Sequence, residues 1–241
     1  MKNRNYFWMA VLLMATLVSC NVNADVTLHE DKTQSIKIDF DGKEAAKIFK
    51  DENKKKKKDR DDLPKEWTSF YDLDKKERTT DADTIAVMKK IYIAVMKKIY
   101  IKGGYDKDEE MTDIFVKTDK LTNKELSLVF NKKDGEEFPV LDLFSKNEWD
   151  GKTLKINTSV LNDMLIKINQ DKECGFDWMI FTKDYRATFH FNSEIKKIEG
   201  KHDLVRKVNN NTVEIKFNVD DVRKKGFKFK NDDSFITITT K

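Results

Sequence analysis

Alternation of apolar and polar residues is the feature that most constrains the fold of this chain. It is clearest in three segments, Gln34–Asp41, Tyr185–Asn192 and Thr212–Val219. The apolar positions in them are Ile36, Ile38, Phe40, Tyr185, Ala187, Phe189, Phe191, Val213, Ile215, Phe217 and Val219. Because successive side chains of a strand point to opposite faces, this period of two predicts antiparallel strands with one face against a core and the other in water.

The order of the segments predicts an α+β fold. From Phe176 onward we expect an antiparallel β-meander, which includes a hairpin around 209–211 and a closing pair of strands, Phe227–Lys230 and Phe235–Thr240. Helices from the N-terminal half of the chain are expected to cover this sheet. A further helix is predicted from Thr158 or Ser159 to Asn169, because Leu161, Leu165 and Ile168 recur at helical spacing.

Three segments of the first half need separate interpretation. Residues 51–62 contain six positive and five negative charges and no apolar side chain, which predicts an exposed loop; a contact with anionic lipid is the alternative. The octapeptide Ile85–Tyr92 recurs at Ile93–Tyr100 and predicts a helix that ends at Gly103-Gly104, with a β-hairpin as the alternative. Leu126–Phe130 and Phe138–Phe144 are predicted to pair as a hairpin.

The first twenty residues have the pattern of an export signal. Lys2 and Arg4 precede an apolar stretch, Tyr6–Val18, which is shorter than the roughly 20 residues that a membrane-spanning helix needs. The stretch ends in Leu17-Val18-Ser19-Cys20, where a small residue stands directly before a cysteine. This pattern predicts removal of the segment rather than a structural helix.

Leu17-Val18-Ser19-Cys20 resembles the lipobox of bacterial lipoprotein precursors. The resemblance implies cleavage between Ser19 and Cys20, loss of residues 1–19 and attachment of fatty acyl chains such as palmitate to Cys20. Asn21, rather than Asp, follows the cysteine, which implies the outer membrane of a Gram-negative cell. A second cut is possible before Asp25, because small residues stand one and three positions before it; this cut would release a secreted protein without Cys20.

The remaining chain is long enough for one large domain or two small ones. We expect a tether over residues 20–33, an α+β part over 34–150 and a helix and sheet part over 151–241; the alternative is that 34–150 and 151–241 form one domain. Loss of Lys2 and Arg4 with the leader lowers the net charge from +4 to +2, which does not favour nucleic acid as a partner. Cys174 would then be the single remaining thiol that carries no lipid, and we expect it to be structural.

No sequence motif identifies a catalytic or metal site. The eight glycines are too scattered for a phosphate-binding loop or a nucleophile elbow. His29, His190 and His202 lack the spacing of metal ligands, and the acidic cluster at 106–110 does not match a calcium loop. The tryptophans Trp67, Trp149 and Trp178 could form a platform for sugars, although single tryptophans in core elements more often serve packing.

These patterns predict a lipid-anchored protein of the cell envelope that binds or scaffolds a protein or glycan partner. We expect no catalytic residue, metal or cofactor. The alternative is a secreted or periplasmic hydrolase with dispersed catalytic residues. A deep cleft that groups His190 or His202 with carboxylates would favour the hydrolase, whereas a flat sheet face would favour binding.

Overall fold

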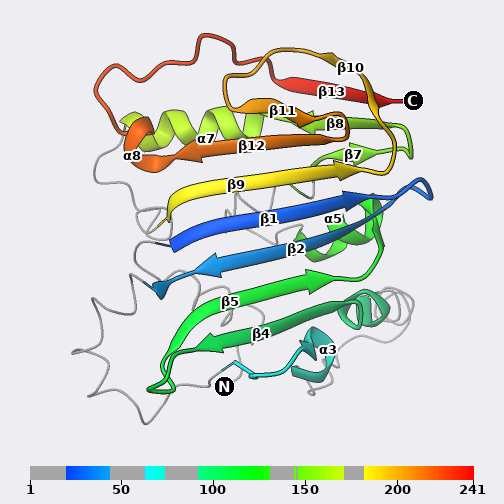
Figure 1. Ribbon diagram of the computed structural model, residues 1–241, viewed down its shortest axis with the longest axis vertical. Helices are drawn as coiled ribbons and strands as arrows, with labels where there is room; N and C mark the ends of the chain where they lie inside the picture. Colours follow the sequence, from blue (N-terminus) through cyan, green and yellow to red (C-terminus); the bar gives the residue numbers. More distant parts are fainter. Residues whose placement is uncertain (1–19, 44–62, 74–91, 131–143, 145, 171–181) are drawn as a thin grey trace, which may run out of the picture. The chain divides into compact units, whose positions relative to one another are not determined.

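The computed structural model describes residues 20–43, 63–73, 92–130, 144, 146–170 and 182–241 (Figure 1). The described residues form mainly strands, with a few short helices. They divide into two compact units, and the chain passes between the units several times. The division does not fall near residue 150, where the sequence suggested a boundary, because β1 (Cys20–Leu28) and β2 (Thr33–Asp41) each contribute residues to both units.

Unit 1 contains residues 20–23, 37–43, 63–73, 92–118 and 182–184 of the described chain. Its strands are hydrogen-bonded in the order β2, β5 (Met111–Thr118), β4 (Ile99–Tyr105) and β3 (Thr68–Ser69), and each pairing is antiparallel. A short helix, α3 (Phe70–Leu73), follows β3 directly. The core of this unit consists of Val22, Ile38, Leu63, Phe70, Val95, Met96, Ile99, Ile101, Ile114 and Val116.

The second copy of the octapeptide repeat differs from its predicted structure. Helix occupies only residues 92–96 of the described part, and the copy then turns and enters β4 at Ile99. Gly103 and Gly104 therefore lie in a strand and do not end a helix. The physical reason is the alternation of Ile99 and Ile101 with Tyr100, which places both isoleucines in the core when the segment pairs with β5. The first copy, apart from Tyr92, lies outside the described residues, as does the loop at 51–62.

Unit 2 contains residues 24–36, 119–130, 144, 146–170 and 185–241. One sheet has the order β11 (Val205–Asn209), β12 (Thr212–Asn218), β9 (Thr182–Phe191), β1 and β2, and β6 (Leu121–Thr122) pairs with the start of β2. A second sheet has the order β10 (Ile195–Glu199), β13 (Phe235–Thr240), β8 (Thr153–Asn157) and β7 (Glu148–Trp149). The helices are α5 (Asn123–Phe130), α7 (Ser159–Gln170) and α8 (Val219–Val222).

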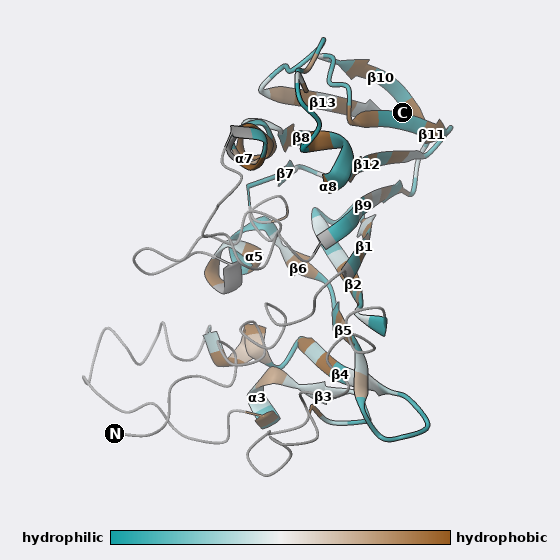
Figure 2. Cartoon of the chain, turned by 90° about the vertical axis from the view of Figure 1, so that its left-hand side faces the viewer, coloured by the Kyte–Doolittle hydropathy of each residue, from teal (hydrophilic) through white to brown (hydrophobic). Residues whose placement is uncertain are grey.

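The helices of unit 2 cover one face of its first sheet. Figure 2 shows α5 and α7 on the same side of β9, β1 and β2. The helix predicted from residue 158 or 159 is confirmed as α7, whose start is capped by Asn157: its Oδ1 accepts a hydrogen bond from the backbone N–H of Ser159 at 3.2 Å. Leu161, Leu165 and Ile168 are buried, as the spacing predicted.

The β-rich α+β character predicted from the sequence is present, but the C-terminal meander is not. The predicted hairpin around 209–211 is confirmed as β11 and β12. β10, however, does not pair with β9; it pairs with β13 in the second sheet. The reason is that β13 pairs with β8 in a separate sheet, and Ile236 and Ile238 of β13 are buried on the apolar face of that sheet.

Three further predictions are wrong. Phe227–Lys230 forms no strand, and the ring of Phe229 instead packs 5.2 Å from the ring of His202. Leu126–Phe130 is the end of helix α5 rather than a hairpin strand, because Thr122 and Glu125 form a capping box at its start, with Thr122 N–H donating to Glu125 Oε2 at 2.8 Å. Residues 20–33 are not a tether, since β1 occupies 20–28 and a tight turn leads from His29 to β2.

Candidate functional site

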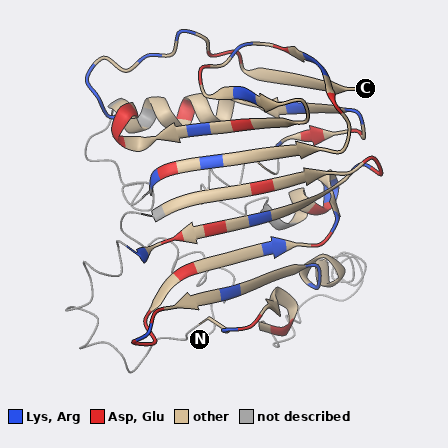
Figure 3. Cartoon of the chain, in the orientation of Figure 1, with Lys and Arg blue, Asp and Glu red and all other residues tan. Residues whose placement is uncertain are grey.

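The open face of the sheet in unit 1 carries lysines and aromatic rings at adjacent positions. Cross-strand partners share a face, and the register pairs Tyr100 with Lys117 and Lys102 with Phe115. The same register places their neighbours Ile99, Ile101, Ile114 and Val116 in the core. The four outward side chains, together with Trp67 just before β3, are called the lysine–aromatic face below. Figure 3 marks the basic positions along β4 and β5 in blue.

The ammonium groups of this face lie over aromatic rings. The Nζ of Lys117 is 4.5 Å from the ring centre of Trp67 and 5.4 Å from that of Tyr100. The Nζ of Lys102 is 5.1 Å from Trp67 and 5.2 Å from Phe115. Contacts of this kind are worth about 0.5–1 kcal/mol each at exposed sites. They hold both flexible lysine side chains against the sheet, and Trp67 joins the two.

The positive charge of this face is not neutralised by the residues described. Neither Lys102 nor Lys117 has a carboxylate within 4.0 Å among the described parts of the chain. The nearest acidic positions have lysine partners of their own: Asp39 is 3.2 Å from Lys37, and Asp113 is 3.4 Å from Lys43. The face therefore presents two ammonium groups to an incoming anion.

Gly104 makes room for Phe115 on this face. A Cβ atom at Gly104 would lie 2.9 Å from Cε2 of Phe115 and 2.9 Å from Cβ of Asp113. Atoms of side chains do not approach so closely, so any larger residue at this position would move the Phe115 ring. Glycine here thus sets the position of one aromatic member of the face.

Cys20, the predicted lipid attachment site, is the first residue of β1. Ser19, on the other side of the predicted cut, lies outside the described residues. The β1–β2 connection is a tight turn in which His29 N–H donates to Thr33 C=O at 2.9 Å, so the two strands run antiparallel and Cys20 lies at the end of the sheet where β2 finishes (Figure 1).

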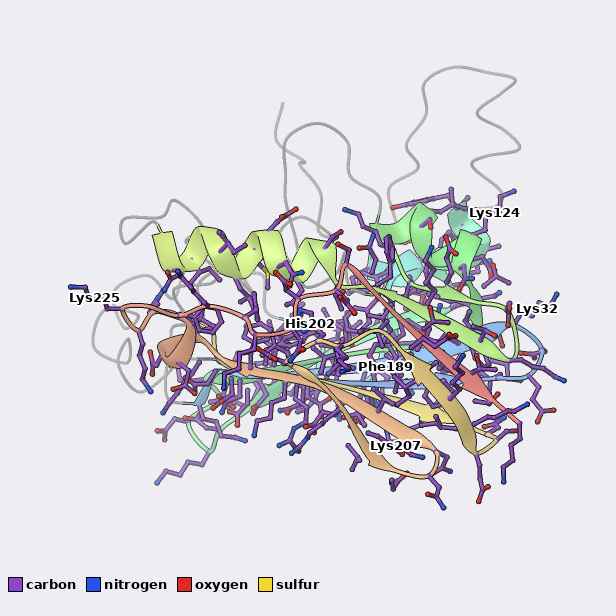
Figure 4. All side chains as sticks on the ribbon, turned by 90° about the horizontal axis from the view of Figure 1, so that it is seen from above. Lys32, Lys124, Phe189, His202, Lys207 and Lys225 are labelled. Atoms are coloured by element: carbon purple, nitrogen blue, oxygen red, sulfur yellow. The ribbon has the colours of Figure 1, made fainter. Side chains whose placement is uncertain are left out.

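The two histidines considered for catalysis lie in different surroundings. The Nε2 of His190 is 3.2 Å from Oδ1 of Asp25, and both side chains are about half exposed, at 45% and 55%. His202 is buried beneath α7 (Figure 4). Its Nδ1 accepts from the N–H of Leu204 at 3.2 Å, so Nε2 carries the proton and donates to Oδ1 of Asn162 at 2.7 Å.

Burial lowers the pKa of His202 below its usual value, although Asp203, Asp232 and Asp233 nearby oppose the shift. A neutral imidazole with both nitrogens hydrogen-bonded has a structural role, because it connects Asn162 of α7 with the backbone at Leu204. Asn162 completes this connection by donating through Nδ2 to the backbone oxygen of Asp232 at 2.9 Å.

The three tryptophans do not form one platform within the described residues. Trp149 is buried, donates from Nε1 to the backbone oxygen of His29 at 2.6 Å and packs edge-on against Phe191. Trp178 and Cys174 lie outside the described residues. Trp67 alone belongs to an exposed face, and its partners there are lysines. Lys102 and Lys117 were not predicted as site residues, because the repeat was predicted to be a helix that ends at Gly103-Gly104 and no local pattern indicates that β4 pairs with β5.

Other chemistries leave no trace in the described residues. No group of three or more His, Cys, Asp or Glu side chains there is arranged to hold a metal ion. None of the helices in the described ranges has the length and apolar character needed to cross a bilayer.

Comparison with known proteins gives no family for this chain. No family model matches it, and no curated protein matches it. A search of solved structures finds the folded domain of the LppM protein of Mycobacterium tuberculosis, determined by NMR, with 14% sequence identity and a TM-score of 0.39. The match covers 100% of this chain and 95% of the LppM domain. At this TM-score the likeness does not establish a shared fold, so function must be argued from the residues themselves.

Proposed function

We propose that this chain is a lipid-anchored protein of the cell envelope that acts as a non-catalytic binding module at the membrane surface. The anchor would be an acylated Cys20, and the binding surface would be the lysine–aromatic face. Asn21 after the cysteine supports the outer membrane as the location. Two acyl chains on one cysteine make a stable anchor, because each buried methylene contributes about 0.8 kcal/mol.

The observation that carries the proposal is the extent of β1. Cleavage before Asp25 would remove residues 20–24, which are five of the nine residues of a strand bonded on both sides, to β9 and β2. Val22 and Ala24 are buried, at 3% and 1% exposed. Losing Val22 alone would cost about 1.5–3 kcal/mol, out of a typical total stability of about 5–15 kcal/mol. Cleavage before Cys20 leaves the whole strand intact, so the fold favours the lipobox cut over the secretory cut.

The hydrolase alternative has less support from the histidines. Both ring nitrogens of His202 are engaged in structural hydrogen bonds. The His190–Asp25 pair stands on an exposed strand surface, where water is not excluded from a reacting group. A flat face with ordered aromatic and charged side chains is suited to binding rather than to covalent chemistry.

The proposal is tested by labelling and flotation. The full chain would be expressed in a Gram-negative host fed an alkyne analogue of palmitate, and its membranes would be floated on a density gradient. We expect the wild-type protein to take up the label and float, and Cys20→Ala to do neither. Cys174→Ala is the matched control, since it removes the second of the two cysteines in the chain and should label normally. Label on Cys20→Ala, or none on the wild type, would contradict the proposal.

A further inference from the structure

We propose that the lysine–aromatic face binds an acidic saccharide of the cell envelope. The inference rests on the proposed function, because the position of the anchor decides between saccharide and lipid. The ammonium groups of Lys102 and Lys117 lack carboxylate partners among the described residues, so an anion on the ligand would complete their charge. The rings of Trp67, Tyr100 and Phe115 lie beside these ammonium groups and offer flat apolar surface for the C–H groups of a sugar ring.

The spacing along the strands places the face above the lipid head groups. On β2, Lys37 lies opposite Lys117, and Asp39 lies opposite Phe115. Phe115 in turn pairs with Lys102 on its other side. The two β2 positions are four and two residues before Asp41, where β2 ends beside Cys20. At about 3.3 Å per residue the face lies about 7–13 Å along the strands from the anchored end.

This height favours a saccharide over a phospholipid. The polar layer of one leaflet is roughly 5–7 Å deep, as the difference between the full bilayer and its hydrocarbon core indicates. In the proposed arrangement the strands rise from the bilayer, because β1 starts at the acylated residue and no stretch of chain separates the sheet from the anchor. The ligand must therefore extend beyond the lipid head groups. A glycan extends that far, whereas the phosphate of a lipid in the same leaflet does not.

The acidic residues near the anchored end add to this assignment. Asp106, Asp108, Glu109 and Glu110 lie in the β4–β5 hairpin, at the same end of the sheet as Asp41 and Gly42, whose N–H donates to Thr112 C=O at 2.9 Å. Lysines pair with acids at this end: Lys65 is 3.0 Å from Glu109, and Lys43 is 3.4 Å from Asp113. The anchored end therefore carries charges of both signs, whereas the lysine–aromatic face presents two ammonium groups without a carboxylate partner among the described residues, which favours an acidic polymer there.

Calorimetric titration of the mature protein, purified from membranes in a neutral detergent, tests this assignment. The probe is the hexamer of galacturonic acid, and its fully methyl-esterified form is the neutral control. We expect the acid to bind, the ester to bind at least about tenfold more weakly, and binding of the acid to weaken with salt. Lys102→Gln/Lys117→Gln should weaken binding of the acid at least about tenfold, and Trp67→Ala should weaken binding of both probes.

Lys155→Gln is the matched control variant. Lys155 also lies over an aromatic ring, 4.2 Å from the ring centre of Phe235, but belongs to unit 2. The affinity of the Lys155→Gln variant for the acidic hexamer should stay within about twofold of the wild type, since Lys155 lies outside the face. Three results would overturn the assignment: no binding of the acidic hexamer, equal binding of a hexamer of glutamic acid, or tighter binding of phosphatidylglycerol presented in mixed micelles with the same detergent. The detergent assay does not need the bilayer, so its failure is separable from a failure of acylation.

Discussion

Replacing Tyr185 with phenylalanine should stabilise the protein. Tyr185 is fully buried in β9, and its hydroxyl has no hydrogen-bond partner among the described residues. Burial raises the pKa of Tyr185 far above its usual value, so the hydroxyl is neutral at every accessible pH. A buried polar group without a partner costs about 1–3 kcal/mol relative to one in water. Phenylalanine removes this group and keeps the ring, which stacks on Phe217 at 4.9 Å.

We therefore expect Tyr185→Phe to raise the free energy of unfolding by about 1 kcal/mol, after allowing for relaxation around the site. For a chain of this size the midpoint of thermal unfolding should rise by about 2–4 °C. Urea unfolding followed by circular dichroism would measure the change. Tyr185→Leu is the control, since it also removes the hydroxyl but loses the ring stack, and it should destabilise the protein. Destabilisation by Tyr185→Phe of about 1 kcal/mol would show that the hydroxyl is bonded, and would refute the reasoning.

Three further predictions concern stability. Since the folded pKa of His202 is lowered, protonation favours unfolding: stability should fall as pH falls below about 6.5, and His202→Gln should flatten this part of the urea midpoint curve. The carboxylate of Glu214 is 7% exposed and lies 2.7 Å from Arg206 and 3.2 Å from Arg186. Glu214→Gln should lower the free energy of unfolding by about 1–2 kcal/mol, whereas Arg206→Gln should lower it less because Arg186 remains. Gly104→Ala should cost about 1–3 kcal/mol by calorimetry and weaken binding of the acidic hexamer, because the new Cβ displaces Phe115; an unchanged affinity would remove Phe115 from the site.

Period-two alternation predicted individual strands well because it depends on local geometry alone. β2, β9, β12 and β13 lie where the apolar alternation predicted them. Strand partners could not be predicted in this way, since β10 pairs with β13 and not with β9. Pairing depends on how two apolar layers are buried together, which no single segment specifies.

The candidate site could not be predicted for the same reason, because it depends on which strands pair. Ile99-Tyr100-Ile101-Lys102 alternates, yet the preceding repeat fitted a helix equally well. Only pairing with β5 settles the strand, and that pairing brings Lys102 beside Phe115 and Lys117 beside Tyr100. Trp67 reaches the same place from a segment more than thirty residues away in the sequence, which no local pattern indicates.

The start of β1 favours one of the two cuts that the leader alone left open. Residues 20–24 were predicted to belong to a tether, from which loss of a few residues has little effect on folding. In the structure they belong to a strand with buried Val22 and Ala24. Burial, rather than the leader pattern, therefore makes the cut before Asp25 costly.

The intact mass of the mature protein, extracted from membranes, tests the central claim most directly. We expect a chain that begins at Cys20 and carries the additional mass of a diacylglyceryl group, with or without a further acyl chain on its amino terminus. Treatment with a strong base should remove ester-linked acyl chains and shift the mass accordingly. A mass that corresponds to an unmodified chain beginning at Asp25 would contradict the account.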